Sequence, residues 1–281
     1  MYIWSLASAQ FIIKVNIFFM VQIGITERGD AAINTGWKKW VENGQPAILI
    51  TKNVKKLIEE NKPLLLNGNV IIHATITGLG GTQFEPHVPN YKKVLEFLEK
   101  QIRYGFPKER LVIRCDPIFI PFMDPERQVS ESYNYKSALS EILNFAIDNN
   151  LRYRISFFDY YPHVRERFKD LPQTLIIEKL NQMQPELHAD ILLRQNFLAM
   201  LKDYIATRGA KTEIEICGEP DLPCAGCLSK KDLDIFGIEL DEDPETGIQR
   251  PACACLGIKR ELLDNKHPCA HGCLYCYWKN N

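Results

Sequence analysis

The sequence predicts an α/β fold, a partial or complete TIM-like (βα) barrel followed by an irregular Cys-rich C-terminal extension. Short apolar runs alternate with longer amphipathic runs along most of the chain, and this alternation is typical of parallel βαβ units. Six repeated units favour a barrel, with a doubly wound sheet as the alternative. The alternation stops near residue 217, and eight of the nine cysteines lie from Cys217 onward.

Six strands are predicted from short runs rich in β-branched and aromatic residues between turn residues. They cover residues 17–25, 47–51, 70–77, 111–114, 152–158 and 212–217. Helices are predicted between the strands from apolar residues at helical spacing. They cover residues 31–43, 53–60, 91–104, 130–149, 161–169 and 185–207. Asp30 is the expected N-cap of the first helix.

Turn residues set the limits of the central elements. The glycines from Gly78 to Gly81 follow the third strand, and Gly105 follows the helix that starts after Asn90. Asp116 and Pro117 are expected to end the fourth strand, because proline lacks the amide that a strand ladder needs. The glycines do not have the spacing of a dinucleotide-binding fingerprint.

Three segments are expected: a leader at 1–15, a barrel-like domain at 16–217, and a metal-binding extension at 218–281 that closes the barrel mouth. The apolar stretch at 11–25 is interrupted by Lys14 and Gln22, and no basic region or small-residue cleavage site accompanies it. It is also short for a membrane span. We therefore predict no membrane association, and a signal anchor is the less favoured reading.

Composition limits the function classes. Hydrophobic residues make up 46% of the chain, enough for a sizeable core. Lys and Arg number 34 against 35 Asp and Glu, so the net charge of −1 gives no general attraction to nucleic acid. An odd number of crowded cysteines favours metal binding over disulfides. Thiolate–iron chemistry requires a reducing compartment, so we expect the cytoplasm.

The last thirteen residues hold the most specific motif. Cys269, Cys273 and Cys276 form a C-x3-C-x2-C run with Tyr275 before the third cysteine. Three thiolates suit a [4Fe–4S] cluster that keeps one iron open, whereas structural zinc usually takes four protein ligands. A zinc site completed by His267, His271 or another cysteine is the alternative.

This motif resembles the cluster motif of the radical S-adenosylmethionine (SAM) enzymes. The resemblance implies that the open iron binds SAM and that Tyr275 lies against its adenine. In that family the motif stands near the start of the barrel, whereas here it ends the chain.

Five further cysteines precede this motif, and four of them could complete a zinc site or a second Fe–S cluster. They are Cys217, Cys224, Cys227, Cys253 and Cys255. The spacing of the five leaves zinc and a second cluster equally open. In either case the metal would fix the extension across the barrel mouth and add folding energy there.

Polar residues follow most predicted strands and should gather at one face of the sheet. Arg114 and Asp116 follow the fourth strand, and Glu219 follows the sixth. We expect Arg114 to bind the SAM carboxylate, Asp116 to bind a ribose hydroxyl or the ammonium, and Glu219 to bind the ammonium. The alternative for Arg114 and Asp116 is a structural salt bridge. His73, inside a strand, is expected to be a hydrogen-bonded core residue.

An ordered set of motifs along the chain resembles a bacterial and phage family of unknown function, DUF1848. The motifs are Arg28–Asp30, Thr75–Gly78, Glu85–Pro89, Arg114–Ile118, Gln249–Cys255 and the terminal cysteine run. The resemblance extends from about Gly24 to Trp278, and it implies radical SAM-like chemistry without a substrate. It favours Cys217, Cys227, Cys253 and Cys255 as the second ligand set. The chain departs from the family pattern at Glu27-Arg28, where the family has two arginines.

The resemblance implies an enzyme that cleaves SAM reductively to methionine and a 5′-deoxyadenosyl radical, which then removes hydrogen from a substrate. The expected partners are a small-molecule or nucleotide substrate and a reductant of the ferredoxin or flavodoxin type. Nucleic acid is not favoured by the net charge. Two alternatives stand beside this hypothesis: a zinc-stabilised ligand-binding module, and an Fe–S redox carrier or sensor without SAM chemistry.

Overall fold

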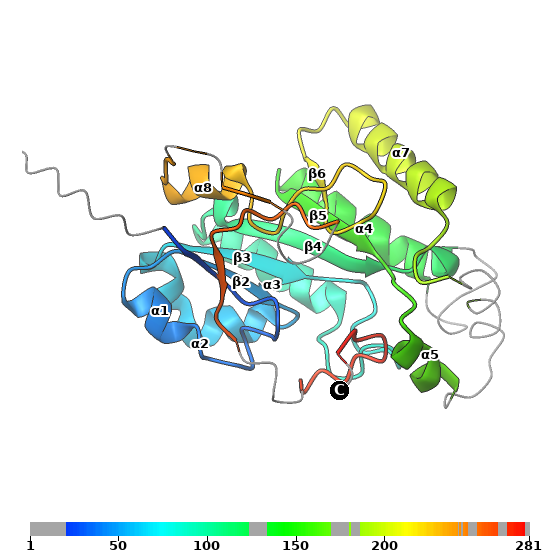
Figure 1. Cartoon of the computed structure of the whole chain (residues 1–281), viewed down its shortest axis with the longest axis horizontal. Coiled ribbons are helices and arrows are strands. Elements are labelled where there is room, and N and C mark those ends of the chain that lie inside the picture. The colour runs from blue at the N-terminus through cyan, green and yellow to red at the C-terminus, as the bar shows by residue number, and fades with distance from the viewer. Residues whose placement is uncertain are drawn as a thin grey trace, which may run out of the picture.

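The computed structural model describes residues 21–123, 134–169, 180, 186–240, 242, 244–246, 252–263 and 269–278. The expected leader at 1–15 lies outside this part of the chain. Figure 1 shows one curved sheet with helices packed along it, and the C-terminal residues beside α5.

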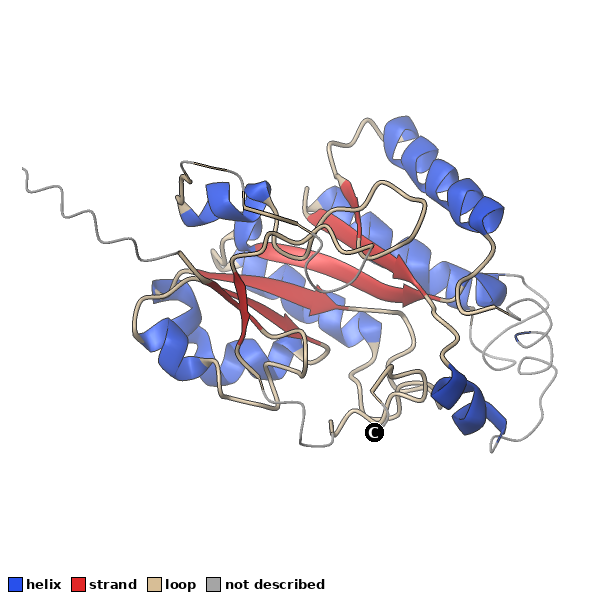
Figure 2. Ribbon diagram, viewed as in Figure 1, coloured by secondary structure: helices blue, strands red, loops and turns tan. Residues whose placement is uncertain are grey.

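Seven parallel strands form the sheet, in the order β6-β5-β4-β3-β2-β1-β7. The strands are β1 (Ile23–Ile25), β2 (Ala47–Thr51), β3 (Val70–Thr75), β4 (Leu111–Ile118), β5 (Arg152–Phe157), β6 (Ile214–Ile216) and β7 (Lys259–Glu261). From β1 to β6 each strand pairs with the next in the chain, without the reversal of order that defines a doubly wound sheet. The sheet curls into a half-barrel (Figure 2), as the sequence predicted.

Helices cover the convex face of the half-barrel. They are α1 (Lys38–Glu42), α2 (Val54–Asn67), α3 (Tyr91–Arg103), α4 (Tyr135–Asp148), α5 (Pro162–Lys169) and α7 (Ile191–Thr207), with short 3₁₀ turns η1 (Lys108–Arg110) and η2 (Ile120–Met123). Alternate strand residues such as Leu49 and Ile113 pack against helix residues such as Leu57 and Ile142 in one core cluster. Successive strand side chains point to opposite faces, so the remaining strand residues line the concave face.

The C-terminal extension covers the concave face. Ile50 and Val112 of the strands form a second core cluster with Leu228, Leu233 and Leu256 of the extension. A parallel sheet must be buried on both faces, and here the second layer is this extension instead of a second set of helices.

The extension is more regular than the sequence predicted. It contains α8 (Lys230–Phe236), which begins with a capping box between Ser229 and Asp232. It also supplies β7, which pairs with β1 and adds a seventh strand to the six expected. The sequence of β7 is Lys-Arg-Glu, so no apolar run marks it.

The first helix is shorter than predicted because Asp30 caps a turn instead. The Asp30 carboxylate accepts hydrogen bonds from the amides of Ala32 (2.8 Å) and Lys52 (2.7 Å) and from the Thr51 hydroxyl (2.6 Å). These bonds tie the end of β1 to the end of β2, and α1 starts only at Lys38. Within the described ranges, every helix is too short or too polar to cross a bilayer.

Candidate metal sites

The tail, defined here as residues 269–278, lies against loops that follow the strands at their carboxyl ends. The imidazole Nε2 of His271 lies 2.7 Å from Oδ2 of Asp30, just after β1. The amide of Leu274 donates to the Phe84 carbonyl at 3.1 Å, in the loop after β3. The tail therefore lies at the face where polar strand-end residues were predicted to gather.

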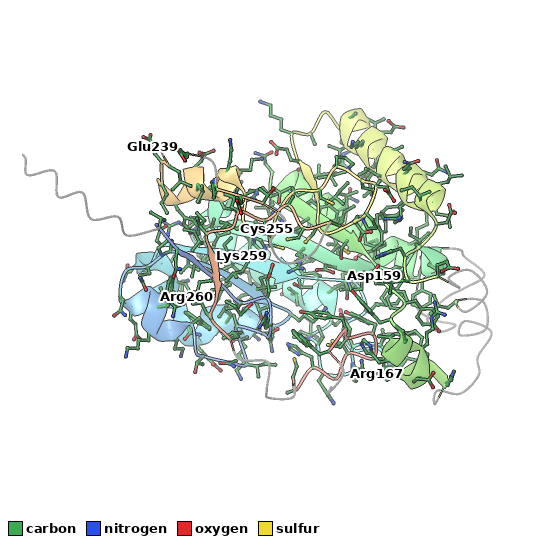
Figure 3. All side chains as sticks on the ribbon, in the orientation of Figure 1. Asp159, Arg167, Glu239, Cys255, Lys259 and Arg260 are labelled. Atoms are coloured by element: carbon green, nitrogen blue, oxygen red, sulfur yellow. The ribbon has the colours of Figure 1, made fainter. Side chains whose placement is uncertain are left out.

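Arg167 of α5 also holds the tail. Its guanidinium donates to the carbonyls of Leu274 (3.3 Å) and Cys276 (2.6 Å), and to that of Trp278. Figure 3 labels Arg167 beside the C-terminal segment. One planar donor group thus fixes the main chain on both sides of the last cysteine. Sequence reasoning missed this residue, because a basic side chain on a short amphipathic helix carries no sign of such a contact.

A buried polar group attaches Tyr275 to the sheet. Lys52 Nζ lies 2.7 Å from Oε1 of Glu85 and 2.8 Å from the Tyr275 hydroxyl, which itself donates to Glu85. Thr77 donates to the other Glu85 oxygen at 2.7 Å. Burial and the neighbouring Glu85 raise the pKa of Tyr275 well above its ordinary value, so it stays a phenol.

The ring of Tyr275 packs edge-on against Phe119, with centroids 5.2 Å apart, and only 8% of the residue is exposed. Its hydroxyl anchors the tail. The contact predicted between this ring and the adenine of SAM stays a prediction.

The three thiols of the tail lie in one another's electrostatic field. Burial raises the pKa of Cys273 to about 12, Lys52 opposes this, and Glu85, Cys276 and Cys269 add to it. The pKa of Cys269 is raised by burial and by Asp30 and Cys276. Thiols that raise one another's pKa in this way become stable thiolates when a metal cation neutralises them. Among the described residues, the ligand atoms of Glu27, Cys227 and Cys255 are the group that lies within 4.8 Å of one another. A metal centre on the three tail thiols, which their C-x3-C-x2-C spacing indicates, stays a prediction.

β4 runs through Asp116 and Pro117 to Ile118, so the prediction that these two residues end the strand was wrong. Arg114 and Asp116 lie two residues apart within it and form an ion pair with each other. Asp116 also accepts from the Ser156 hydroxyl of β5. Burial would raise the pKa of Asp116, but Arg114, Ser156 and Lys52 together lower it. The predicted structural salt bridge is thus present, and the roles of both residues toward SAM stay predictions.

A second cysteine group, called here the concave group, lies on the inner face of the half-barrel. Cys217 follows β6, and its sulfur is 3.2 Å from that of Cys227 in the extension. The Cys227 amide donates to the sulfur of Cys255 at 3.1 Å. A carboxylate oxygen of Glu27 and the sulfurs of Cys227 and Cys255 all lie within 4.8 Å of one another.

In the sequence, Glu27 stood out only as a departure from the family pattern, and no metal role was predicted for it. The sequence separates it from the concave group by about 190 residues or more, so its place beside the sulfurs comes from the tertiary fold. Lys259 binds Oε2 of Glu27 at 2.8 Å. Burial raises the pKa of Glu27, and Cys227 raises it further.

Cys253 is partly buried and packs against the same core cluster that contains Cys217, Cys227 and Cys255. Cys224 bonds to the main chain of Glu219, accepting from its amide at 3.1 Å and donating to its carbonyl at 3.0 Å. Burial raises the pKa of Cys224, and Glu219 and Cys253 add to this. Of the predicted second set, Cys227 contacts both Cys217 and Cys255, and Cys253 interacts with Cys224.

Glu219 is held by structural partners. It accepts from the Phe157 amide at 2.6 Å and pairs with Arg194 of α7 at 3.1 Å. Burial raises its pKa to about 7. These bonds link α7 to the ends of β5 and β6, and a contact of Glu219 with the SAM ammonium stays a prediction.

Buried arginines surround the concave group. Arg154 of β5 pairs with Glu215 and donates to the carbonyls of Gly226 (2.5 Å) and Ala225 (3.3 Å) in the extension. His73 of β3 is fully buried, as predicted, but neither ring nitrogen has a hydrogen-bond partner among the described residues. Its hydrogen-bonded state was therefore predicted wrongly. Burial and Arg154 hold its pKa well below the ordinary value, so it is neutral.

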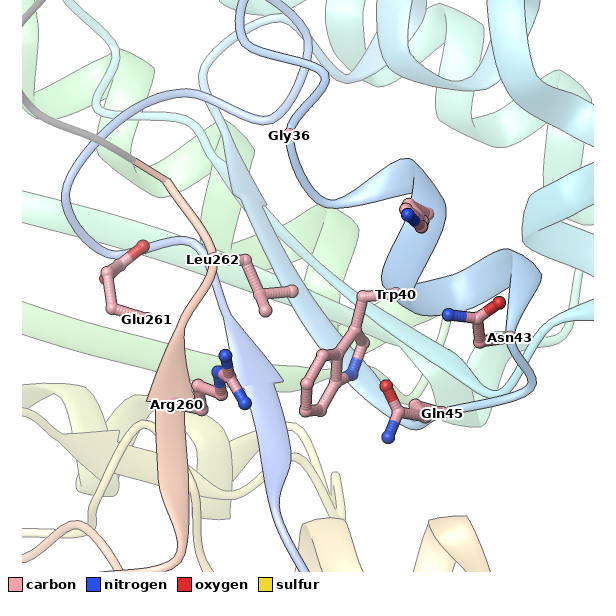
Figure 4. A pocket seen from close by; sticks show the side chains of 8 residues that line it. Gly36, Trp40, Asn43, Gln45, Arg260, Glu261 and Leu262 are labelled. Atoms are coloured by element: carbon pink, nitrogen blue, oxygen red, sulfur yellow. The ribbon is translucent and has the colours of Figure 1, made fainter.

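A hollow of the surface lies apart from both cysteine groups. It is formed by α1 and β7, where the Arg260 guanidinium lies over the Trp40 ring at 5.3 Å from the ring centre (Figure 4). The remaining lining side chains include Lys39, Asn43 and Gln45. No cysteine lines it, so the metal sites stand on the two sulfur groups.

A family model described as a domain of unknown function, DUF1848, matches residues 41–278. A search of curated proteins finds no match. The crystal structure of Streptococcus suis SuiB bound to precursor peptide SuiA aligns at 13% identity with a TM-score of 0.38, over 64% of this chain and 33% of SuiB. The crystal structure of a metagenomic short-chain oxidoreductase in complex with NADP aligns at 11% identity with a TM-score of 0.26, over 77% of this chain and 88% of the oxidoreductase chain. The chain thus spans about a third of SuiB, and both likenesses are too distant to bear on function.

Proposed function

We propose a function for this chain, which belongs to the DUF1848 family of unknown function: it is a radical SAM-like Fe–S enzyme. Its tail would hold a [4Fe–4S] cluster on Cys269, Cys273 and Cys276. The observation that carries the proposal is the fixed position of the tail. Arg167, Lys52 and Glu85 hold it at the carboxyl ends of the strands, where (βα) barrels carry their active sites.

Such a cluster would supply the electron for the reductive cleavage of SAM. Three cysteine ligands leave one iron for SAM. The protein supplies binding, orientation and shelter from water. Cys273 is buried, whereas Cys269 and Cys276 keep some exposure, and their side of the tail is where we propose that a ferredoxin or flavodoxin type of reductant docks.

Arg114 and Asp116 are the residues proposed to orient SAM. The Arg114 guanidinium is planar and can bind a carboxylate through two parallel hydrogen bonds. Its Nε atom is buried and has no partner among the described residues. Asp116, kept ionised by Arg114, could accept from a ribose hydroxyl or the ammonium. The substrate we propose is a small molecule or nucleotide bound at the same end of the half-barrel, in the cytoplasm.

Anaerobic reconstitution with iron and sulfide tests this function. With dithionite, we expect the protein to convert SAM to methionine and 5′-deoxyadenosine. Cys273→Ala should abolish this turnover because one iron ligand is lost. Cys115→Ala is the control, since Cys115 is buried in β4 within the main core cluster. Turnover retained by Cys273→Ala would contradict the assignment of this triplet. Iron bound without SAM binding would favour an Fe–S redox carrier or sensor.

Zinc in the tail is the second candidate, and one contact favours it. Asp30 bonds to Nε2 of His271, and metal-bound histidines commonly direct their other ring nitrogen at a carboxylate. In that case the chain would be a zinc-stabilised ligand-binding module. A colourless protein with stoichiometric zinc at the tail, after expression with both metals supplied, would replace the enzyme proposal.

A further inference from the structure

We propose that Cys217, Cys227, Cys255 and Glu27 bind one zinc ion on the concave face of the half-barrel. This proposal does not rest on SAM chemistry, because it concerns a different site. The family resemblance gave four cysteines and left the metal open. The structure places a Glu27 oxygen beside Cys227 and Cys255, so we assign Glu27 as the fourth ligand in place of Cys253, and we assign a single ion instead of a cluster.

The separations of the ligand atoms distinguish one ion from a cluster. Around a tetrahedral zinc with Zn–S bonds of about 2.3 Å, sulfurs lie about 3.8 Å apart. In a [4Fe–4S] cluster each cysteine binds a different iron, so the sulfurs stand farther apart. The sulfurs of Cys217 and Cys227 are 3.2 Å apart, and Cys227, Cys255 and Glu27 lie within 4.8 Å of one another. The separations among Cys227, Cys255 and Glu27 match a single central ion, and Cys217 joins them through its contact with Cys227.

The donor atoms also suit zinc. Zinc in structural sites takes four ligands from thiolate, imidazole and carboxylate groups. Cys227 and Cys255 are almost fully buried and Cys217 is 7% exposed, as a closed structural site requires. Lys259 binds one oxygen of Glu27 at 2.8 Å. A carboxylate has a second oxygen, so Lys259 can orient Glu27 while the other oxygen faces the ion.

Buried cations balance the charge of the proposed site. Three thiolates and one carboxylate around a divalent ion carry two net negative charges, which are costly to bury without partners. Arg154 donates to the carbonyls of Ala225 and Gly226, the two residues before Cys227. Arg154 pairs with Glu215 and Arg114 with Asp116, and the Nε atoms of both arginines are buried without a partner among the described residues. These cations can offset part of the negative charge of the proposed centre.

The fold brings the four ligands from separated places. Cys217 follows β6, Glu27 follows β1, and the extension crosses between them with Cys227 and Cys255. A side chain at Gly226 would meet the main chain of Ala254 and Cys255 at about 2.5 Å. Glycine at this position thus permits the close approach of the two chain segments that carry Cys227 and Cys255. The ion would link the strands near the two edges of the half-barrel, β1 and β6, to the extension that covers its concave face.

The first test uses full-length protein in which the three tail cysteines are replaced by alanine. It is expressed with iron and zinc both supplied, and bound metals are measured by mass spectrometry. We expect one zinc per chain and no iron. Cobalt exchanged into the intact wild-type protein should give the absorption bands of tetrahedral cobalt–thiolate, which tests the geometry even if the triple variant folds poorly. About four irons per chain retained in the triple variant, or octahedral cobalt bands, would overturn the proposal.

The second test identifies the fourth ligand. We expect Glu27→Ala to weaken zinc binding at least about tenfold in competition with a chelator, whereas Cys253→Ala should leave it unchanged. Glu239→Ala is the matched control, since Glu239 is an exposed residue just after α8 (Figure 3). Weakening by Cys253→Ala and not by Glu27→Ala would overturn the assignment of Glu27. Loss of SAM cleavage with zinc retained would count only against the proposed enzyme function.

Discussion

The two cysteine groups differ in how far the protein closes around them. In the concave group, Cys217, Cys227 and Cys255 are exposed by 7%, 2% and 3%. In the tail only Cys273 is buried, at 7%, while Cys269 and Cys276 keep partial exposure. A closed metal site serves architecture, and a site with an accessible side can receive another molecule. The comparison therefore agrees with the two proposals, a structural ion in the concave group and a reactive centre in the tail.

The two groups are also held by different parts of the fold. Ion pairs such as Arg154–Glu215, and packing of Leu228 and Leu256 on the strands, fix the concave group. The tail is fixed to the loops after the strands by Arg167, which donates to its carbonyls, and by the side-chain bonds of Tyr275 and His271. Damage to the concave group should then weaken the whole fold, whereas damage to the tail should stay local.

The largest expected effect separates the groups directly. Cys227→Ala should lower the free energy of unfolding by about 4 kcal/mol or more, because it removes a metal ligand at the centre of the covering layer. Cys273→Ala should cost about 1 to 2 kcal/mol, since it affects one loop. Urea denaturation of both metal-loaded variants measures the difference. Equal losses would show that the tail is as structural as the concave group.

An intermediate effect is expected from Arg154→Met, which keeps the length of the side chain and removes its charge. It loses the pair with Glu215 and the bonds to Gly226 and Ala225. Truncating one partner of a buried pair costs about 3 to 5 kcal/mol, and about 3 is expected because Arg152 still binds Glu215 at 2.7 Å.

The same urea titration measures this cost. Arg103→Met, at an exposed ion pair of α3, is its control and should cost less than about 1 kcal/mol. A loss no larger than that of the control would contradict the view that Arg154 fastens the extension to the sheet.

The smallest effect on global stability is expected from Arg167→Lys. Lysine keeps the charge but lacks the planar fork that reaches the carbonyls of Leu274, Cys276 and Trp278. Amide exchange in residues 269–278 should accelerate about tenfold, and the free energy of unfolding should change by less than about 1 kcal/mol. Hydrogen exchange read by mass spectrometry measures the exchange rates of the tail and of the sheet in one experiment. Faster exchange throughout the sheet would show that the tail is not an independent unit.

The sequence predicted the repeated part of the fold well. The second strand has the predicted limits, 47–51, because its β-branched and apolar run stands between clear turn residues. The βα alternation predicted the half-barrel, and the point near residue 217 where the alternation stops predicted the Cys-rich extension. The seventh strand was missed because β7 is three polar residues that pair with β1, more than 230 residues earlier in the chain. Its strand conformation depends on that partner and leaves no local pattern.

The predicted site residues stay predictions, unlike the fold. The cysteine spacings indicated which residues could bind metal, and the strand-end rule indicated the face at which the tail would lie. Glu27 and Arg167 could not be assigned, because each acts through a neighbour that only the tertiary fold supplies. The family resemblance favoured Cys253 as a ligand together with Cys255, and this assignment stays a prediction, whereas the Glu27 oxygen beside Cys227 and Cys255 became visible only in the structure.

The pairing of β1 with β7 has a consequence for biosynthesis. The strand that begins the sheet keeps one edge open until residues 259–261 have left the ribosome. Unpaired strand edges attract other chains, so the nascent protein carries this risk through nearly all of its translation. Pairing with β7, the polar Lys-Arg-Glu strand, removes this risk. A truncated chain without β7 would leave the apolar Ile-Gly-Ile edge of β1 exposed to aggregation.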